Sequence, residues 1–587
     1  MTCLAPPPQA SLATSTYPDT GVGLKKWFGP AYRPYWILLA LALLFRLATA
    51  LLFHQPGYTD AYYYSNVAES LWRGRGFRED YIWNYLGRPL PAATVGNPSS
   101  LYWMPFTSIL IYFAYLLGGG PSFLASQMPG ILLSAALAPL TFNLATTIFG
   151  TGPVGRRYGW LAGWLVIFSG IYAGYFVQAD NFAPFALLSF AFLVCTTQAL
   201  QRLTNGAPGV YRRTALAGSL AGLAYLTRVD GLILLAVPFL CALLQWPRLK
   251  SVLPQTFKAV LLMLGLFVLV VSPWVIRNLA VSGQLFPGGG LKVLFWREYN
   301  DFFSFSKPLD LAYYLNLTQP EVNWGLGPLV GSKVAALAEN LLIVARSALF
   351  LTPFFIIGLF SRGISSADQP AHDLTENQPS SRLHLWQRPQ FQPFLVYTLL
   401  LYLAMSLAFT FPGTRGSLFH SSGGLLPYIF LVCVVGLDTA IAWLGRFSRP
   451  QATATRQRFY GFLIAAAFFG LSVGLIFSML GNWDKDYEEL KPVEVWLDNH
   501  EKPDVVVMLP LGPAYWYITH RPSVATASDL LAVNLQIARQ YQARYLVLMP
   551  DHYPDSFAEL YDTKKASGFE LVATFGEVQL YRLGFIT

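Results

Sequence analysis

Long apolar segments separated by short polar connections dominate the chain. The first of them, ILLALALLFRLATALLF at 37–53, contains a single charged residue, Arg46. A helix needs about 20 mostly apolar residues to cross a bilayer, so segments of this kind predict membrane-spanning helices. The candidate spans, roughly eleven in number by this criterion, are 36–53, 122–149, 159–178, 182–201, 214–227, 231–246, 258–276, 337–360, 393–411, 425–445 and 460–481.

One further apolar segment, 102–119, is not counted as a span, because the distribution of basic residues argues against it. Lys and Arg concentrate in the cytoplasmic connections of membrane proteins. If the amino terminus is cytoplasmic and 102–119 lies at the interface or is re-entrant, all the strongly basic connections fall on the inner side. These connections contain Arg156, Arg202, Arg248, Arg382 and Arg446.

The chain changes character after residue 481. DVVVMLP (504–510) and ARYLVLM (543–549) predict buried strands, and LLAVNLQIARQYQ (530–542) predicts a helix between them. FELVATFGEVQLYRL (569–583) predicts a β-hairpin. We therefore expect a small α/β domain at 482–587, on the outer face of the membrane.

The predicted fold class is thus mostly α: a polytopic bundle of membrane helices with a C-terminal extracytoplasmic α/β domain. Residues 1–30 are rich in Pro, Ser and Thr, which predicts a disordered cytoplasmic tail. Residues 31–481 form the transmembrane module, with large outer loops expected at 54–121 and 277–336.

Composition supports a membrane protein. Of the 587 residues 54% are hydrophobic and only 12% are charged, about half the charged share of soluble domains. The net charge of +9 does not indicate nucleic acid, because the basic residues lie mainly in the inner connections. Four cysteines are too few for a disulfide framework.

Two acids stand at membrane boundaries on the same predicted side. Asp60 opens YTDAYYYSNVAESLWRGRGF, directly after the first span, and Asp180 lies in FVQADNF, between two spans. The simpler alternatives are a helix N-cap for Asp60 and an ordinary turn for Asp180. Ionisable groups at membrane depth are functional candidates by default, so the pair predicts a site.

Basic residues near the same face are candidates for holding an anion. Arg228 stands in YLTRVDGLILL, where a structural ion pair with Asp230 is the alternative. His420 stands in the Gly-rich loop PGTRGSLFHSSGGLLP, and a lone histidine is more often structural than a ligand. The basic candidates are Arg228, Lys292, Arg297 and Arg415.

These features together resemble the GT-C membrane glycosyltransferases, with closer similarity to the aminoarabinose transferase and protein O-mannosyltransferase-like branch. The resemblance is carried by TDAYYYSNVAESLWRGRGF, NPSSLYWMPFTSIL, QADNF, AGLAYLTRVDGLILLAVP and SPWVIRN. The chain departs from its relatives at Asn97, where they often have Lys or His, and at Tyr62 and Tyr63, where a basic residue is common. The WWD motif of the oligosaccharyltransferases is missing.

The resemblance implies an enzyme that moves a sugar from a polyprenyl-phosphate donor to a lipid, protein or polysaccharide acceptor at the outer face, with inversion. It implies Asp60 as general base, with Asp180 orienting the acceptor or joining Asp60 in a site for Mg²⁺ or Mn²⁺. Arg297, with Arg228, Lys292 and Arg415, would hold the donor phosphate. The residues expected to contact the sugar or the acceptor are Tyr63, Asn97, Tyr102 and His420.

Two other classes stay open at this point. A transporter or flippase of lipid-linked sugars would also combine many spans with buried charges, although we find no repeat between the two halves of the chain. A glycan polymerase or ligase would share the donor and differ in the acceptor. We expect an integral protein of a bacterial or archaeal cell membrane, with the active site outside; the sugar is not indicated.

Overall fold

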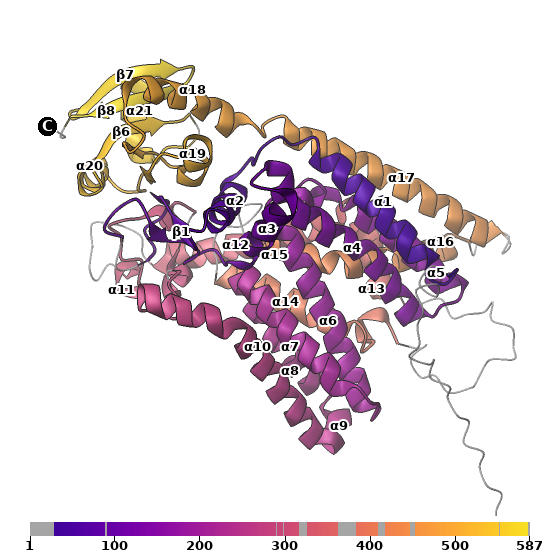
Figure 1. Cartoon of the computed structure of the whole chain (residues 1–587). Helices are drawn as coiled ribbons and strands as arrows, with labels where there is room; N and C mark the ends of the chain where they lie inside the picture. Colours follow the sequence, from indigo (N-terminus) through magenta and orange to yellow (C-terminus); the bar gives the residue numbers. More distant parts are fainter. Residues whose placement is uncertain are drawn as a thin grey trace, which may run out of the picture.

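The computed structural model describes residues 29–87, 91–288, 290–296, 299–315, 326–361, 383–408, 417–445, 452–550 and 552–584. The chain is mostly helical (Figure 1). Within the described ranges, seven helical segments are long and apolar enough to cross a membrane. They are Arg33–Ala50 (α1), Phe123–Phe149 (α4), Phe182–Thr204 (α6), Trp246–Ser282 (α9, η5 and α10), Leu326–Leu359 (α12, η8 and α13), Leu418–Gly445 (in α15, η12 and α16) and Ala454–His500 (in α17 and α18).

An eighth span results if the pair Pro153–Phe168 (α5) and Gly170–Val177, bent by 44°, is counted as one. The break lies at Ser169, whose backbone is left-handed with φ of 58°. The predicted count of about eleven spans is therefore not confirmed. The other three predicted segments are helical but fall short of a span by length or composition: Val210–Thr227 (α7), Val229–Leu244 (η4 and α8) and Gln392–Leu407 (α14).

The apolar segment predicted at the interface, 102–119, forms the helix α3, Phe106–Gly118. Its 13 residues rise about 20 Å, which is less than the roughly 30 Å of a bilayer core. The segment is therefore too short to cross as a helix by itself, in agreement with the charge argument.

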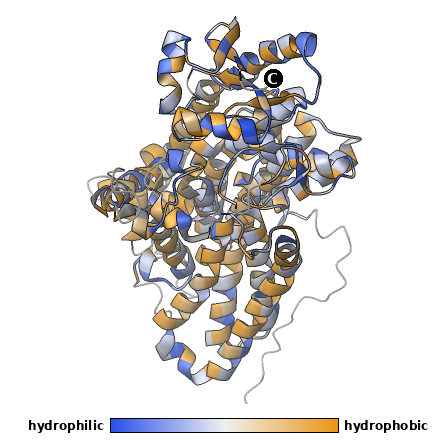
Figure 2. Ribbon diagram, turned by 90° about the vertical axis from the view of Figure 1, so that its left-hand side faces the viewer, coloured by the Kyte–Doolittle hydropathy of each residue, from blue (hydrophilic) through white to orange (hydrophobic). Residues whose placement is uncertain are grey.

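Small residues let the helices of the bundle approach closely. A Cβ atom at Gly218 of α7 would lie 2.3 Å from the carbonyl oxygen of Met263 on α10, so the two backbones are in contact. Close backbone approach at small residues is typical of helix packing in membranes. Apolar ribbon predominates in the helices that project away from the α/β part of the chain (Figure 2).

The C-terminal part contains a sheet of six strands in the order β2-β5-β4-β6-β8-β7. The predicted strands and hairpin are confirmed, and the helix between the two strands is α20, Leu531–Gln540. The strands are Tyr81–Ile82 (β2), Val506–Met508 (β4), Ser523–Val524 (β5), Ala543–Leu548 (β6), Phe569–Phe575 (β7) and Val578–Leu583 (β8). Their helices are Lys485–His500 (α18), Gly512–Thr519 (α19), α20 and Ala558–Thr563 (α21).

One strand of this sheet comes from a different part of the chain. β2 belongs to the loop 54–121 and pairs in parallel with β5, so that Tyr81 stands opposite Ser523. The boundary predicted at 482 therefore divides a single sheet. The α/β unit consists of the tail together with β2, which stands at the edge of the sheet.

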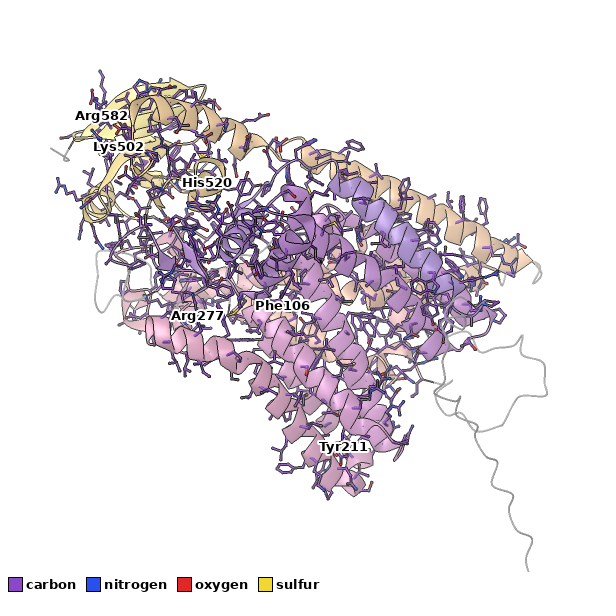
Figure 3. All side chains as sticks on the ribbon, in the orientation of Figure 1. Phe106, Tyr211, Arg277, Lys502, His520 and Arg582 are labelled. Carbon is purple, nitrogen blue, oxygen red and sulfur yellow. The ribbon has the colours of Figure 1, made fainter. Side chains whose placement is uncertain are left out.

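The same loop is held to the α/β unit by the helix α2, Thr59–Trp72, which packs on α19. The rings of Tyr62 and Tyr517 lie 5.2 Å apart, and Asn66 Nδ2 donates a hydrogen bond of 2.8 Å to the carbonyl of Pro513. His520 stands at this junction (Figure 3). The helix that carries Asp60 is thus packed against the C-terminal part of the chain.

Candidate active site

Asp60 lies in the first turn of α2, and its carboxylate is open to a ligand. The helix begins at Thr59 and Tyr58 occupies the N-cap position, so the alternative that Asp60 caps the helix is wrong. The residue is half-buried. No described residue donates a hydrogen bond to its carboxylate, which leaves the oxygens open to a ligand.

Asp180 is buried and firmly held in the turn between Tyr175–Val177 (η3) and α6. The hydroxyl of Tyr58 donates a hydrogen bond of 2.6 Å to Asp180 Oδ2, and the backbone N–H of Asn181 donates to Oδ1. Because Tyr58 directly precedes α2, this hydrogen bond links the two acidic segments. Asp180 thus belongs to a turn, as the simpler alternative predicted, and at the same time faces Asp60.

His420 joins the two acids from a distant part of the chain. It lies on α15, Ser417–Ser421, and its ring stacks on Phe182 with the centroids 4.1 Å apart. Its Nδ1 is buried and has no hydrogen-bond partner among the described residues. Side-chain ligand atoms of Asp60, Asp180 and His420 all lie within 4.8 Å of one another, and we call these three residues the Asp–Asp–His cluster.

Burial and mutual repulsion act on the two carboxyls in the same direction. Burial raises the pKa of Asp60 well above its usual range, and the nearby charge of Asp180 adds to this shift. Burial also raises the pKa of Asp180, although the hydrogen bonds from Tyr58 and Asn181 oppose the increase. Two close carboxylates in such surroundings favour sharing a proton or binding a cation.

Arg228 supplies the positive charge next to the acids. Its Nε donates hydrogen bonds of 3.0 Å to Asp230 Oδ1 and to Ser421 Oγ, and Nη1 donates to Asn181 Oδ1 at 3.3 Å. The predicted ion pair with Asp230 is confirmed. The remaining nitrogen, Nη2, makes no hydrogen bond with any residue in the described part of the chain, so it can donate to a ligand.

Aromatic side chains form a wall beside the cluster. Trp83 and Trp103 are stacked with centroids 3.9 Å apart, and Tyr63 packs on Trp103 at 4.4 Å. Tyr102 meets the edge of Phe302 at 4.8 Å. The Tyr64 hydroxyl accepts a hydrogen bond of 3.0 Å from Asn181 Nδ2, and the Tyr64 ring lies 6.3 Å from that of Trp103, so the wall reaches the acid cluster.

Tyr63 and Asn97 are tied into the loop itself. The Tyr63 hydroxyl donates a hydrogen bond of 2.9 Å to Glu79 Oε2 and accepts one of 2.6 Å from the backbone N–H of Ser100. Asn97 lies on β3, Asn97–Pro98, opposite Glu79 on β1, Arg78–Glu79, and its Nδ2 donates to the carbonyl of Ala93. The Tyr63 hydroxyl and Asn97 Nδ2 thus stabilise the loop 54–121 through hydrogen bonds.

Of the three other predicted cations, Lys292 lies among the described residues. Lys292 lies on the 3₁₀ helix η6, Gly290–Phe295, which packs on the aromatic wall through Val293 and Phe295. Arg297 and Arg415 lie outside the described residues. The sequence interpretation treated His420 and the two acids separately, and it overlooked Tyr58 as the partner of Asp180.

The cluster has the donor set of a divalent cation site. Two carboxylates and one imidazole whose buried Nδ1 is unpartnered suit Mn²⁺ better than Mg²⁺, which prefers oxygen ligands alone. The expectation from sequence named the two acids only, and the structure places His420 beside them as a third candidate ligand. Asp60, Asp180 and His420 would hold such an ion.

The arrangement of the helical bundle and the α/β unit matches solved structures of the GT-C fold, so the predicted resemblance is confirmed for the fold. The chain is similar to ArnT from Cupriavidus metallidurans, solved bound to undecaprenyl phosphate, with 12% identity, a TM-score of 0.53, and 93% of this chain and 97% of that one covered.

A second similarity is to the archaeal oligosaccharyltransferase AglB from Archaeoglobus fulgidus, solved with an inhibitory peptide and a dolichol-phosphate. Here the identity is 13%, the TM-score is 0.51, and the match covers 87% of this chain and 69% of that one. No protein-family profile and no curated protein sequence matches the chain. The structural matches establish the fold, and because the sequence identities are low, the activity has to be argued from the site.

Proposed function

We propose that the protein is an integral-membrane glycosyltransferase that moves a sugar from a polyprenyl-phosphate donor to a hydroxyl acceptor, with inversion at the sugar. The observation that carries the proposal is the Asp60 carboxylate. It is half-buried, it accepts no hydrogen bond from a described residue, and it is held against Asp180 and His420. The fold adds support, since the similar ArnT structure holds undecaprenyl phosphate and the similar AglB structure holds a dolichol-phosphate.

Asp60 is the general base in this proposal. The acceptor oxygen attacks the anomeric carbon while its proton passes to Asp60, and the bond from that carbon to the lipid phosphate breaks. Burial and the charge of Asp180 raise the pKa of Asp60, and the charge of Arg228 opposes the increase by favouring the carboxylate, which is the form that can accept the proton. Direct attack from the face opposite the phosphate produces inversion, because a single displacement reverses the configuration.

Asp180 acts as the partner that fixes the geometry. Its hydrogen bond from Tyr58 holds the chain just before α2, so Asp60 is presented at a defined distance from Asp180. A carboxylate held in this way can accept a hydrogen bond from the acceptor and orient its hydroxyl. A divalent cation held by Asp60, Asp180 and His420 would supply positive charge to the departing phosphate or acidify the acceptor hydroxyl.

The leaving group is a lipid phosphate whose negative charge increases as the bond breaks. Arg228 can donate from Nη2 while its other nitrogens stay bonded to Asp230, Ser421 and Asn181. A guanidinium already fixed by neighbours stabilises charge without having to be ordered during the reaction. Lys292, Arg297 and Arg415 remain candidates for further phosphate contacts.

The aromatic wall is the proposed surface for the sugar. Tyr102 and Trp103 are only partly buried, and both stand within the aromatic group that reaches the acid cluster. Flat aromatic faces with polar edges suit a sugar ring, which also has an apolar face and a polar edge. His420, Tyr63 and Asn97 are further candidates for sugar or acceptor contacts.

The test uses purified full-length protein in liposomes, with wild type, Asp60→Asn and the matched control Glu570→Gln, an exposed acid on β7. Release of polyprenyl phosphate is followed from a panel of labelled polyprenyl-phosphate sugars in the presence of membrane extract. Wild type and Glu570→Gln are expected to release lipid phosphate, and Asp60→Asn should be slower by about 10²–10⁴-fold.

The outcome separates the proposal from its rivals. Release that is equal in wild type and Asp60→Asn would contradict a base at this position. If no protein releases lipid phosphate but the labelled donor changes leaflet, the flippase alternative replaces the transferase. A labelled acceptor that grows by repeated units would identify a polymerase, which shares the donor chemistry.

A further inference from the structure

A groove of about 420 Å³ runs between α5 and α17 (Ala452–Leu480), away from the Asp–Asp–His cluster. It follows the first part of α17 and, on α5, runs from Arg157 to the last residue, Phe168, whereas Asp180 lies further along the chain, after the C-terminal end of α5. Its walls are apolar and aromatic, and two arginines stand among them. Those lining side chains include Arg157, Trp160 and Trp164 of α5 and Arg458, Phe462 and Phe469 of α17.

The length of the groove matches one leaflet of a bilayer. Along α17 its lining runs from Gln457 to Phe469, which is a rise of about 18 Å at 1.5 Å per residue. Half the hydrocarbon core of a bilayer is about 15 Å thick. A chain lying in the groove would therefore begin at the membrane surface and end near the middle of the membrane.

The charges of the groove lie at one end. Arg157 Nη1 donates to Asp438 Oδ1 at 2.9 Å, and this bond neutralises the buried acid. Arg458 is exposed and forms no ion pair with a described carboxylate. Arg456 precedes it by two residues on α17, and Arg156 lies near the start of α5, the helix on the other side of the groove. The mouth of the groove is thus basic, while its length is apolar.

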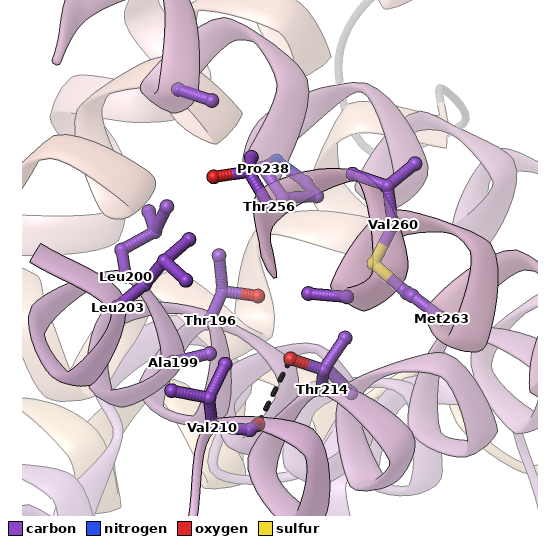
Figure 4. A pocket seen from close by; sticks show the side chains of 13 residues that line it. Thr196, Ala199, Leu200, Leu203, Val210, Thr214, Pro238, Thr256, Val260 and Met263 are labelled. Atoms are coloured by element: carbon purple, nitrogen blue, oxygen red, sulfur yellow. Dashed lines mark hydrogen bonds between the residues drawn. The ribbon is translucent and has the colours of Figure 1, made fainter. Parts of the chain in front are cut away.

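A second cavity illustrates how the groove differs from an ordinary packing gap. It lies among α6, α7, α8 and α10, measures about 50 Å³, and is lined by apolar and threonine side chains (Figure 4). In it Thr214 donates to the carbonyl of Val210, as the dashed line in Figure 4 marks. That volume admits only a few waters and no acyl chain.

We infer that the groove between α5 and α17 binds an anionic diacyl phospholipid of the leaflet opposite the Asp–Asp–His cluster. One acyl chain lies along Trp160, Trp164 and Phe462, and the phosphate lies at Arg458. An apolar wall alone would accept any membrane lipid, because lipid tails are as apolar as the groove. The basic mouth is what selects a negative headgroup, since a basic residue near an anionic lipid favours binding.

The test is native mass spectrometry of the delipidated full-length protein in detergent, with equimolar phosphatidylglycerol and phosphatidylcholine of identical chains. Wild type should retain phosphatidylglycerol in preference. In Arg458→Gln this preference should fall by about fivefold, the factor that corresponds to about 1 kcal/mol for one basic residue. Ala465→Trp, which fills the groove, should lose the bound lipid of both kinds.

Two matched variants control for general effects. Ala467→Trp changes an exposed alanine of α17 that does not line the groove. Arg212→Gln removes an exposed arginine at the start of α7, which carries the labelled Tyr211 in Figure 3. Both should bind lipid as wild type does. An unchanged preference in Arg458→Gln, equal binding by the two tryptophan variants, or displacement of the lipid by polyprenyl phosphate would each overturn the inference.

Discussion

Trp483 fixes the loop that delivers Asp60, and Gly57 makes this contact possible. The indole Nε1 donates a hydrogen bond of 2.8 Å to the carbonyl of Gln55, and the ring packs on Phe53 at 4.6 Å and on Tyr58 at 5.6 Å. Gly57 lies directly beneath the ring, without a side chain to hold it away. The indole comes from the junction between α17 and α18, so the C-terminal part of the chain reaches the site here.

The substitution Gly57→Ala should displace this contact. A Cβ atom at Gly57 would lie 2.3 Å from Trp483 Cε2, and carbon atoms settle at about 3.5 Å, so about 1.2 Å of movement is required. Overpacking of this kind costs about 1–3 kcal/mol. Because Asp60 follows three residues later, the displacement should reach the acid, and a shift of about 1 Å can lower kcat/KM by about 10²-fold.

The assay is a double-mutant comparison of donor turnover and thermal unfolding in detergent. Gly57→Ala should lose activity, and Gly57→Ala combined with Trp483→Leu should recover part of it, because the smaller leucine frees the space that the methyl group needs. Residues in contact show interaction energies of about 0.5–3 kcal/mol in such cycles. Strictly additive effects on both activity and Tm would refute the proposed contact between the two side chains.

Three further results are expected. Burial raises the pKa of Glu79 to about 8 in the folded state, whereas an unfolded glutamate titrates near about 4.3. The proton on Glu79 therefore stabilises the folded state fully below about pH 4.3, and this stabilisation is lost as the pH rises through 8. Tm should consequently fall from about pH 6 to 9 more steeply in wild type than in Glu79→Gln. Parallel curves would contradict this. Mn²⁺ at 100 times its Kd should stabilise wild type by about 2.7 kcal/mol and leave His420→Ala unchanged, as followed by Tm; equal shifts would exclude the cluster as its site. Removal of 482–587 leaves β2 unpaired and uncovers Tyr62, so binding of labelled polyprenyl phosphate should be lost together with turnover; retained binding would show that the loop is independent.

The membrane bundle could largely be predicted from the sequence, because a bilayer demands long apolar segments and the chain supplies them. The break at Ser169 could not be predicted, since a left-handed serine is decided by its surroundings: Arg46 Nη2 donates to Ser169 Oγ at 2.6 Å and also to the carbonyl of Val166. The predicted number of spans is not confirmed. Segments such as α7 are helical, yet their arginines and small residues place them below the apolarity of an independent span.

The acids of the site could be predicted because few carboxylates stand at the ends of spans. The neighbour His420 could not be assigned to them, since it lies 240 residues after Asp180 and reaches it only through the packing of α15 on α6. Nor could the edge strand β2 be predicted. Its two residues pair with β5 across more than 400 positions of sequence, and a strand this short has no recognisable period.

The site depends on contacts between segments that are remote in sequence, and each contact has a distinct chemical role. Tyr58 bonds to Asp180 and thereby sets the distance between the two acids. Phe182 stacks on His420 and orients its imidazole toward them. Trp483 holds the loop before Asp60 from the C-terminal side. Since Tyr58 is bonded to Asp180 in the bundle and Trp483 reaches the same loop from the junction of α17 and α18, the position of Asp60 depends on the bundle and on the C-terminal part of the chain together.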